Sequence, residues 1–215
     1  MSGSNMNHNS EGFKKLVSRR PDYLLKILKK YPRIIFSDID TVWFKDPRPY
    51  LTGNYDFWAQ IDGIIDGKPY FSGFIPYFCT GFLALQATGT SMNLLKKWSQ
   101  VLGESVSTYF VNRHQISMCI IFFSFIESKP HLNQISFQKV VFELSANGKV
   151  LPMDKFSPGN IYFETLSNED RNSVIMVHNN HIKGKAKKIQ RFEHFQLWTL
   201  SEGKFHEFDS INHVF

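Results

Sequence analysis

Two aspartates, Asp38 and Asp40, close the short apolar run in the stretch RIIFSDIDTVWFKDP, residues 33–47. Residues i and i+2 of a β-strand point to one face, so the two carboxylates are expected to aim at one place. Adjacent carboxylates repel each other unless a cation or a shared proton lies between them. The pair therefore predicts a site for Mn²⁺ or Mg²⁺, which take carboxylate oxygens together with substrate phosphate oxygens. A phosphoryl-transfer nucleophile with its acid partner and a solvated turn are the other two interpretations.

A second polar cluster, VHNNHIKGK at residues 177–185, combines an imidazole with groups that bind phosphate. His178 ends an apolar run, and a neutral imidazole is a common metal ligand. Gly184 lets the backbone approach a phosphate, while Lys183 and Lys185 add positive charge near the start of the helix expected next. A single histidine more often makes a structural hydrogen bond, and a basic cluster is often a solvated helix face. It is the joint occurrence with the aspartate pair that predicts a site for a metal-bound diphosphate.

The surrounding pattern predicts helices that alternate with strands, which is typical of an α/β sheet. Ligands of such sheets gather at the carboxyl ends of strands, where the aspartate pair and His178 both fall. A Gly- and Pro-rich loop is expected at residues 63–77. The predicted helices are residues 20–32, 90–103, 112–128 and 183–198, and the predicted strands are 33–38, 42–47, 56–62, 79–87, 134–144 (as short strands), 161–163 and 173–178.

Composition predicts one medium globular domain. The chain has 215 residues, of which 42% are hydrophobic and 20% charged, enough for a sizeable core. The first eleven residues are rich in Ser and Asn and are expected to be disordered, which leaves residues 12–215 as a single domain. The net charge of +6 favours anionic partners. No recognisable nucleic-acid-binding module accompanies it, so we expect no nucleic-acid partner.

Cysteine usage and hydropathy exclude several further classes. The two cysteines, Cys79 and Cys119, cannot form a thiolate zinc cluster or a disulfide framework, and both are expected to be buried free thiols. The longest apolar run, residues 116–126, is too short to span a bilayer. The polar first residues lack the hydrophobic region of a signal peptide. We therefore expect no membrane span and no targeting segment in this chain.

Five stretches occur in the order seen in nucleotide-diphospho-sugar transferases: FSDIDTVWFKDPRPYL, YDFWAQIDG, CTGFLALQAT, LLKKW and VHNNHIKGKAKKIQRFEHFQLW. Over residues 12–198 the chain resembles glycosyltransferase family seventy-seven, the group that includes plant xylosyl-, arabinosyl- and galactosyltransferases. The resemblance implies an α/β GT-A fold with a mixed central sheet and flanking helices. The strand and loop that usually hold the uracil precede the helix at residues 20–32, so the domain is expected to lack its first strand.

The resemblance also implies an enzyme. It would move a pentose or galactose, with retention, from a UDP-sugar to a glycan or glycoprotein acceptor with the help of Mn²⁺ or Mg²⁺, in the Golgi lumen. Where family members often have an acidic residue, this chain has His114, so a nucleotide-sugar-binding protein with weak turnover is an alternative. The matched residues are Asp38, Asp40 and His178 for the metal, Asp38, Thr80, Gly81, Asn179, Lys183, Gly184 and Lys185 for the substrate, and Asp62 and Gln115 near the reacting sugar.

A rival resemblance concerns the first motif alone. IIFSDIDTV is similar to the start of haloacid-dehalogenase-like phosphatases, where Asp38 would be the nucleophile and Asp40 the general acid. Such enzymes need a second acidic motif after a later strand. Here the later strand ends in His-Asn-Asn, and Glu169 and Asp170 lie in a polar stretch, which disfavours the phosphatase.

Overall fold

The computed structural model describes residues 16–62, 64–65, 68–69, 71–72, 75–103 and 132–198. The chain divides into two compact units, Met1–His181 and Ile182–Phe215, and each is described by itself. The expected disordered segment 1–11 and the predicted helix 112–128 lie outside the described residues. Gln115 and Cys119 belong to that helix and are therefore not placed.

The described strands of the first unit form two mixed sheets, in agreement with the predicted α/β class. The larger sheet has the order β1-β8-β3-β9, with β3 and β9 parallel and the other pairs antiparallel. The smaller sheet has the order β10-β11-β2, with β10 and β11 parallel and β2 antiparallel to β11. Two short ladders, β4 with β5 and β6 with β7, fall in the predicted loop. The bounds are β1 Arg33–Ser37, β2 Thr41–Trp43, β3 Phe57–Ile61, β4 Ile64–Ile65, β5 Lys68–Pro69, β6 Phe71–Ser72, β7 Ile75–Pro76, β8 Phe78–Gln86, β9 Gly148–Val150, β10 Phe156–Pro158 and β11 Met176–His178.

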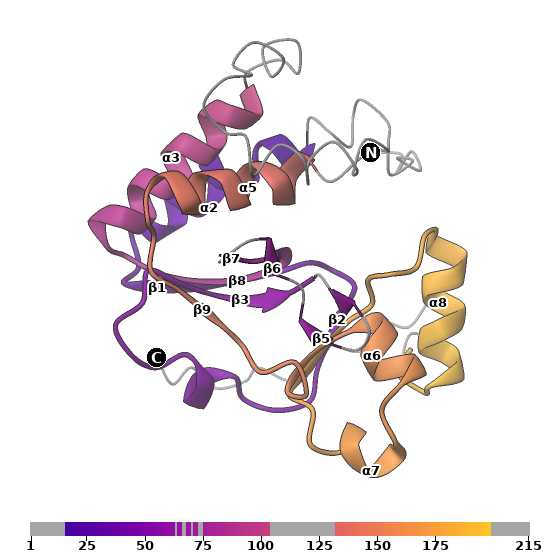
Figure 1. The fold of residues 1–215 in the computed structure, drawn as a ribbon. Coiled ribbons are helices and arrows are strands. Elements are labelled where there is room, and N and C mark those ends of the chain that lie inside the picture. Colours follow the sequence, from indigo (N-terminus) through magenta and orange to yellow (C-terminus); the bar gives the residue numbers. More distant parts are fainter. Residues whose placement is uncertain are drawn as a thin grey trace. The chain divides into compact units, whose positions relative to one another are not determined.

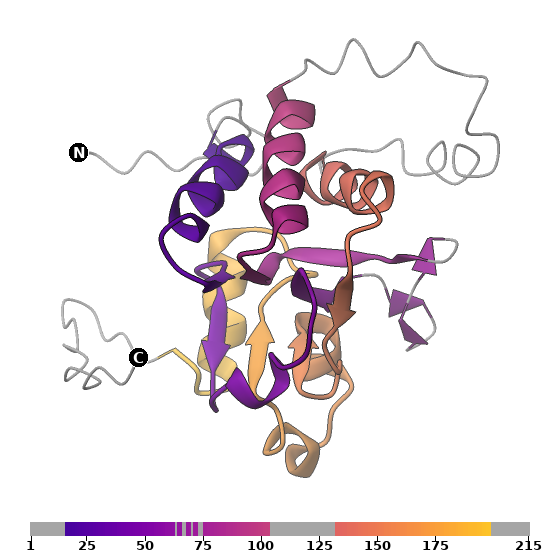
Figure 2. The ribbon, with the colours of Figure 1, turned by 90° about the vertical axis from the view of Figure 1, so that its left-hand side faces the viewer.

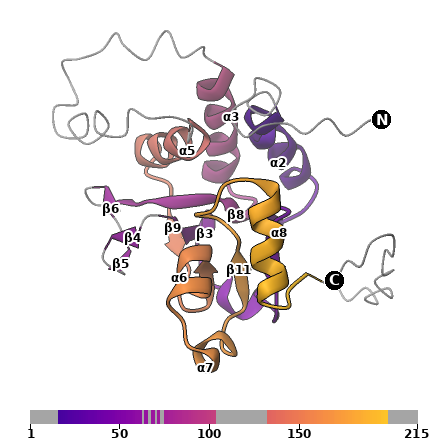
Figure 3. The ribbon, with the colours of Figure 1, turned by 90° about the vertical axis from the view of Figure 1, so that its right-hand side faces the viewer.

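Three helices, α2, α3 and α5, lie together over one face of the larger sheet (Figures 1 and 2). Their bounds are α2 Arg20–Leu28, α3 Gly89–Gly103 and α5 Leu132–Glu143. Further short helices in the described part of this unit include a 3₁₀ turn at Arg48–Tyr50, α6 Gly159–Glu164 and α7 Asn168–Arg171. Figure 3 shows α6 and α7 at the end of the unit opposite the three packed helices.

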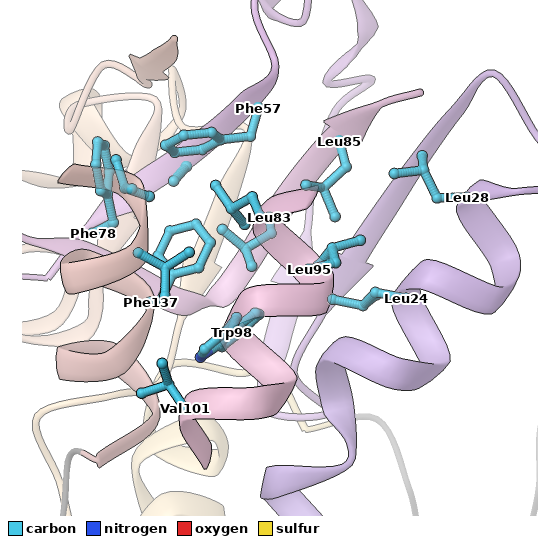
Figure 4. Close-up of a cluster of buried hydrophobic side chains, with 14 residues drawn as sticks. Leu24, Leu28, Phe57, Phe78, Leu83, Leu85, Leu95, Trp98, Val101 and Phe137 are labelled. Atoms are coloured by element: carbon cyan, nitrogen blue, oxygen red, sulfur yellow. The ribbon is translucent and has the colours of Figure 1, made fainter. Parts of the chain in front are cut away.

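The core between the helices and the larger sheet is apolar and aromatic (Figure 4). Trp98 of α3 and Phe137 of α5 are fully buried, with ring centroids 4.9 Å apart. The Trp98 indole N–H donates to the Asn133 carbonyl and to the Ser136 hydroxyl, so the polar end of the ring is satisfied. This core cluster includes residues of β8, with residues of β1 packed against it, and the candidate site is built next to these two strands.

Two predicted strands are wrong, because the structure has helices there. Residues 134–144 lie largely in α5, and residues 161–163 lie in α6. The β-branched and aromatic side chains of both segments favour strands locally. In α5, however, the buried residues Phe137, Val140 and Val141 follow the i, i+3, i+4 spacing of a helix face. The three apolar residues of the second segment are too few to show a period.

The strand before the aspartate pair is confirmed, and it is partly exposed. β1 is an edge strand paired with β8, and its Ile35 side chain is 44% exposed. The preceding helix is confirmed, with Pro21 in its first turn. On this helix Leu24 and Leu28 are buried, whereas Ile27 is exposed.

The described part of the second unit is built on α8, Lys185–His194, which confirms the predicted final helix. Gly184 precedes it with a positive φ of 96°, a conformation that glycine adopts without strain. Among the described residues of the whole chain, no helix combines the length and the apolar character needed to cross a bilayer.

Candidate metal-binding site

Asp38 and Asp40 lie in the connection between β1 and β2, where the chain passes from the larger sheet to the smaller one. β1 ends at Ser37, so the strand geometry from which the two aspartates were expected to share one face does not extend to them. Main-chain hydrogen bonds hold the connection on both sides: Asp38 N–H donates to the Gly81 carbonyl at 2.7 Å, and Asn179 N–H donates to the Asp40 carbonyl at 2.8 Å. Ile39 between them is fully exposed, with a relative accessibility of 103%.

His178, the last residue of β11, faces the two aspartates. Its Nε2 atom lies 3.4 Å from Asp40 Oδ1 and 3.9 Å from Asp38 Oδ2. One donor atom from each of the three residues lies within 4.8 Å of the others. The imidazole is buried, with only 5% of the residue exposed. The predicted convergence of these three residues at strand ends is therefore present in the structure.

These donor atoms fit a hard divalent cation. In an octahedral complex with ligand distances of about 2.1 Å, neighbouring ligand atoms lie about 3 Å apart and opposite ones about 4 Å apart. The two separations from His178 Nε2, 3.4 and 3.9 Å, lie between these values. Two carboxylates with one imidazole suit Mn²⁺ or Mg²⁺ better than a thiophilic metal. The group can hold such an ion and still offer further positions to phosphate oxygens.

Gly81 provides the space in which this group assembles. A Cβ atom at Gly81 would lie 2.3 Å from His178 Cε1 and 2.8 Å from Asp38 Oδ2, closer than atoms in contact allow. The pairing of β3 with β8 shifts at this point, from Ala59 opposite Leu83 to Gln60 opposite Cys79. Such an irregularity changes the direction of side chains locally. It brings the backbone of Gly81 against the carboxylate and the imidazole.

Arg20, at the start of α2, is a site residue that sequence reasoning missed. Its guanidinium donates to Asp38 Oδ1 at 2.8 Å and to the Thr80 carbonyl at 2.7 Å, and it lies 4.6 Å from the centre of the Phe36 ring. The side chain is 15% exposed. This pairing occupies Oδ1 of Asp38 and leaves Oδ2 on the side of His178. Nothing local in the sequence marks Arg20, because its partners are 18 and 60 residues away.

Behind His178, two uncharged groups contact its other ring nitrogen. Nδ1 lies 3.3 Å from Gln60 Oε1 and 3.4 Å from Cys79 Sγ. Burial raises the pKa of the Cys79 thiol well above its usual value, and the carboxylates of Asp62 and Asp38 raise it further. Cys79 is therefore a neutral thiol, which confirms the predicted buried free cysteine. Gln60 was also missed, since a glutamine inside an apolar strand carries no motif.

Comparison with known proteins gives the family. The family model described as nucleotide-diphospho-sugar transferase matches residues 1–192. The chain belongs to this family. The predicted resemblance to transferases of the family-seventy-seven type is thereby confirmed, and between the two families considered for the Asp38 motif the transferase is the correct one.

Two curated relatives show which proteins this chain is similar to in sequence. The chain is 33% identical over 205 residues to UDP-D-xylose:L-fucose alpha-1,3-D-xylosyltransferase 3 of Arabidopsis thaliana, covering 90% of this chain and 49% of the relative. It is 23% identical over 209 residues to UDP-galactose:fucoside alpha-3-galactosyltransferase of Dictyostelium discoideum, covering 94% of this chain and 30% of the relative. The chain thus spans about half the length of the plant relatives it matches.

The fold is of the predicted GT-A type, with mixed sheets and flanking helices. A glycosyltransferase involved in the glycosylation of the major capsid of PBCV-1 superposes with a TM-score of 0.53 at 13% identity, covering 91% of this chain and 81% of that one. At this identity the likeness concerns the fold alone.

The other residues matched to the family differ in how the structure places them. Thr80 is buried, and its carbonyl accepts from Arg20. Asn179 is fully buried directly after His178. Lys183, Gly184 and Lys185 belong to the second unit, where both lysines are exposed at the start of α8.

Asp62, expected near the reacting sugar, is held by hydrogen bonds on both carboxylate oxygens. Gln134 Nε2 donates to Oδ2 at 2.6 Å, and Asn180 Nδ2 donates to Oδ1 at 2.8 Å. His181 Nε2 lies 3.5 Å from Oδ1, and the Asp62 side chain is 13% exposed. Two amides and an imidazole thus fix the orientation of this carboxylate.

Proposed function

We propose that this chain is the nucleotide-sugar-binding part of a metal-dependent glycosyltransferase. It transfers a pentose or galactose, with retention, from a UDP-sugar to a glycan or glycoprotein acceptor. The observation that supports this most strongly is the convergence of Asp38, Asp40 and His178 around Gly81 in a chain of the nucleotide-diphospho-sugar transferase family.

In this proposal, Asp38, Asp40 and His178 hold Mn²⁺ or Mg²⁺. When bound, such an ion would supply Lewis-acid stabilisation of the negative charge on a departing diphosphate. Arg20 keeps Asp38 in the orientation that turns Oδ2 toward the ion, because the guanidinium is anchored at the same time by the Thr80 carbonyl. The two main-chain bonds from Asp38 and Asn179 keep the aspartates and the histidine in register.

Lys183, Gly184 and Lys185 are proposed to bind the diphosphate. The geometry inside the second unit supports this, because Gly184 directly precedes α8 and Lys185 is its first residue. The first-turn N–H groups of a helix have no intrahelical partner and favour anions. Two exposed lysines at the same helix end add positive charge.

Asp62 and Gln115 are proposed to act at the reacting carbon, with Thr80, Gly81 and Asn179 lining the donor site. A glycosyl transition state resembles an oxocarbenium ion, which a fixed carboxylate or amide beside it stabilises. The orientation of Asp62 by Gln134 and Asn180 supports this role, since catalytic groups need a fixed position. Retention is compatible with a covalent intermediate and with attack from the same face.

The names of the relatives suggest which substrates to test first. The plant relatives are named for xylose transfer to L-fucose, and the Dictyostelium relative for galactose transfer to a fucoside. We therefore extend the proposal to a fucose-containing acceptor. The Golgi lumen, where the family works, is the proposed location.

The test compares the wild-type chain with Asp40→Ala and with Asp154→Ala as control. Asp154 is an exposed aspartate whose salt bridge is with Lys155. At 100-fold excess over its dissociation constant, UDP with Mn²⁺ is expected to stabilise the wild-type chain by about 2.7 kcal/mol. At about 2–4 °C per kcal/mol this is a rise in Tm of about 5–10 °C. The control should keep this shift and Asp40→Ala should lose it.

Turnover is measured separately, as release of UDP from a panel that includes UDP-xylose and UDP-galactose, with and without a fucoside acceptor. Metal-dependent release supports the transferase. Binding of UDP without release from any donor would favour the nucleotide-sugar-binding alternative. Unchanged binding in Asp40→Ala would refute the metal assignment.

A further inference from the structure

We propose that Gln60 is a positioning residue that holds the proton of His178 on Nδ1, so that the lone pair of Nε2 faces Asp38 and Asp40. The tautomer itself is independent of the proposed function, whereas its consequence for metal binding rests on it. Three steps lead from the fold to this assignment.

The first step is that the main chain fixes the orientation of the Gln60 amide. Gln60 is fully buried in β3, and its Nε2 donates to the Phe156 carbonyl of β10 at 3.1 Å. A main-chain carbonyl can only accept a hydrogen bond, so the group that faces it must be the NH₂ end of the amide. The oxygen Oε1 is therefore at the other end, 3.3 Å from His178 Nδ1.

The second step is that this oxygen decides which ring nitrogen carries the proton. An amide oxygen has no proton to donate, so the hydrogen bond forms only if Nδ1 of His178 is the donor. A neutral imidazole carries a single proton, which leaves Nε2 with its lone pair. Nε2 is the atom that lies 3.4 Å from Asp40 Oδ1.

The third step concerns the alternative tautomer, for which the Asp40 carboxylate is the hydrogen-bond acceptor. With the proton on Nε2, His178 would donate to the Asp40 carboxylate, and a cation would have to displace that proton in order to bind. Gln60 opposes this because the other tautomer would leave its buried oxygen facing a lone pair, which costs about 1–3 kcal/mol. The glutamine therefore prepares the imidazole as a ligand before any ion arrives.

The other neighbour of Nδ1 does not replace Gln60. Cys79 Sγ lies 3.4 Å from Nδ1, but a neutral thiol is a weak hydrogen-bonding group. Gln60 and Cys79 are brought opposite each other by the shift in the pairing of β3 with β8 after Ala59. The same irregularity that gives Gly81 its position thus also directs Gln60 toward His178.

The experiment uses the full 215-residue chain and two variants of Gln60. Gln60→Leu removes the acceptor, whereas Gln60→Glu keeps an oxygen that can accept from Nδ1. Gln138→Leu is the matched control, because Gln138 is also buried, but its amide bonds the main chain of Phe78 and Pro76 and not a histidine. Each protein is studied by ¹⁵N NMR of its histidine rings at pH 8.5 without metal, and by titration with Mn²⁺.

We expect the Nδ1–H tautomer of His178 in the wild-type chain, Gln60→Glu and Gln138→Leu, and the Nε2–H tautomer in Gln60→Leu. The Mn²⁺ affinity of Gln60→Leu should fall about 10- to 100-fold, the usual effect of removing the partner of a metal-bound histidine. Gln138→Leu should lose stability without losing Mn²⁺ affinity.

The proposal is overturned if the wild-type chain carries the proton of His178 on Nε2, or if Gln60→Leu keeps it on Nδ1. The wild-type spectrum decides the first point even if Gln60→Leu does not fold. Absence of Mn²⁺ binding by a wild-type chain that shows the Nδ1–H tautomer would instead refute the proposed function, so the two failures are distinguishable.

Discussion

Replacing Gly81 by alanine tests the candidate site through one added methyl group. The new Cβ would lie 2.3 Å from His178 Cε1, 3.0 Å from His178 Nδ1 and 2.8 Å from Asp38 Oδ2. All three distances fall below ordinary van der Waals contact, which begins at 3.4 Å. Because Gly81 lies in the middle of β8, paired with β1, its backbone cannot retreat without disturbing the sheet.

The expected losses of stability and of Mn²⁺ affinity depend on how far the His178 ring must move to make room for the methyl group. To restore contact distance, the His178 ring must move by about 1 Å, which is several times the tolerance of about 0.2 Å for a metal ligand. The ring is buried and its far side meets Gln60 and Cys79. We expect Gly81→Ala to fold, to lose about 1–3 kcal/mol of stability from overpacking, and to lose at least about tenfold in Mn²⁺ affinity.

The assay is thermal unfolding together with Mn²⁺ titration in the presence and absence of UDP. A loss of 1 kcal/mol lowers the Tm of a chain of this size by about 2–4 °C. Gly89→Ala is the matched control, since a Cβ at Gly89 meets no atom within 4 Å. A Gly81→Ala variant that matches this control in both Tm and Mn²⁺ affinity would show that Gly81 does not lie against His178 and Asp38.

Three further predictions concern Arg20, the two lysines at the start of α8, and Cys79. Arg20→Lys keeps the charge but cannot bond the Asp38 carboxylate and the Thr80 carbonyl together, so Mn²⁺ affinity should fall by about threefold to tenfold; unchanged affinity in calorimetry would contradict this role of Arg20. Replacing Lys183 and Lys185 together by alanine should weaken the binding of UDP by about tenfold or more and the binding of uridine hardly at all. Equal losses of affinity for the two ligands would count against a diphosphate role. Because burial raises the pKa of Cys79, native alkylation at pH 8, mapped by mass spectrometry, should be far slower than in urea. The unfolded chain releases this proton first, so stability should decrease as the pH rises above the usual thiol pKa, and native labelling as fast as in urea would disprove the burial.

The convergence of the metal-binding residues could be predicted because it depends on local signals. Asp38 and His178 each follow an apolar run, and the ends of strands are where α/β folds collect ligands. The reason given for the aspartate pair was nevertheless wrong, since the strand ends at Ser37 and the two residues lie in a connection. The joint motifs identified the family, whereas neither motif would have done so by itself.

The supporting residues could not be predicted, because their partners are distant in sequence. Gln60 contacts His178, which is 118 positions away in the sequence, and Phe156, which is 96 positions away. α5 was missed for a related reason. Its β-branched and aromatic residues favour a strand locally, but the packing of Phe137 against Trp98 and Phe57 stabilises the helix instead.

The position of the site between the two sheets explains why its residues depend so strongly on main-chain contacts. Asp38 extends the pairing of β1 with β8 in the larger sheet, while Asp40 is joined to the residue after β11 in the smaller one. The two aspartates are thus hydrogen-bonded to different sheets, and the separation of their carboxylates depends on how these sheets meet. Gln60 spans the same junction, from β3 to the Phe156 carbonyl of β10 and the His178 ring of β11. A change that lets the sheets shift relative to each other should therefore weaken metal binding even where no ligand is altered.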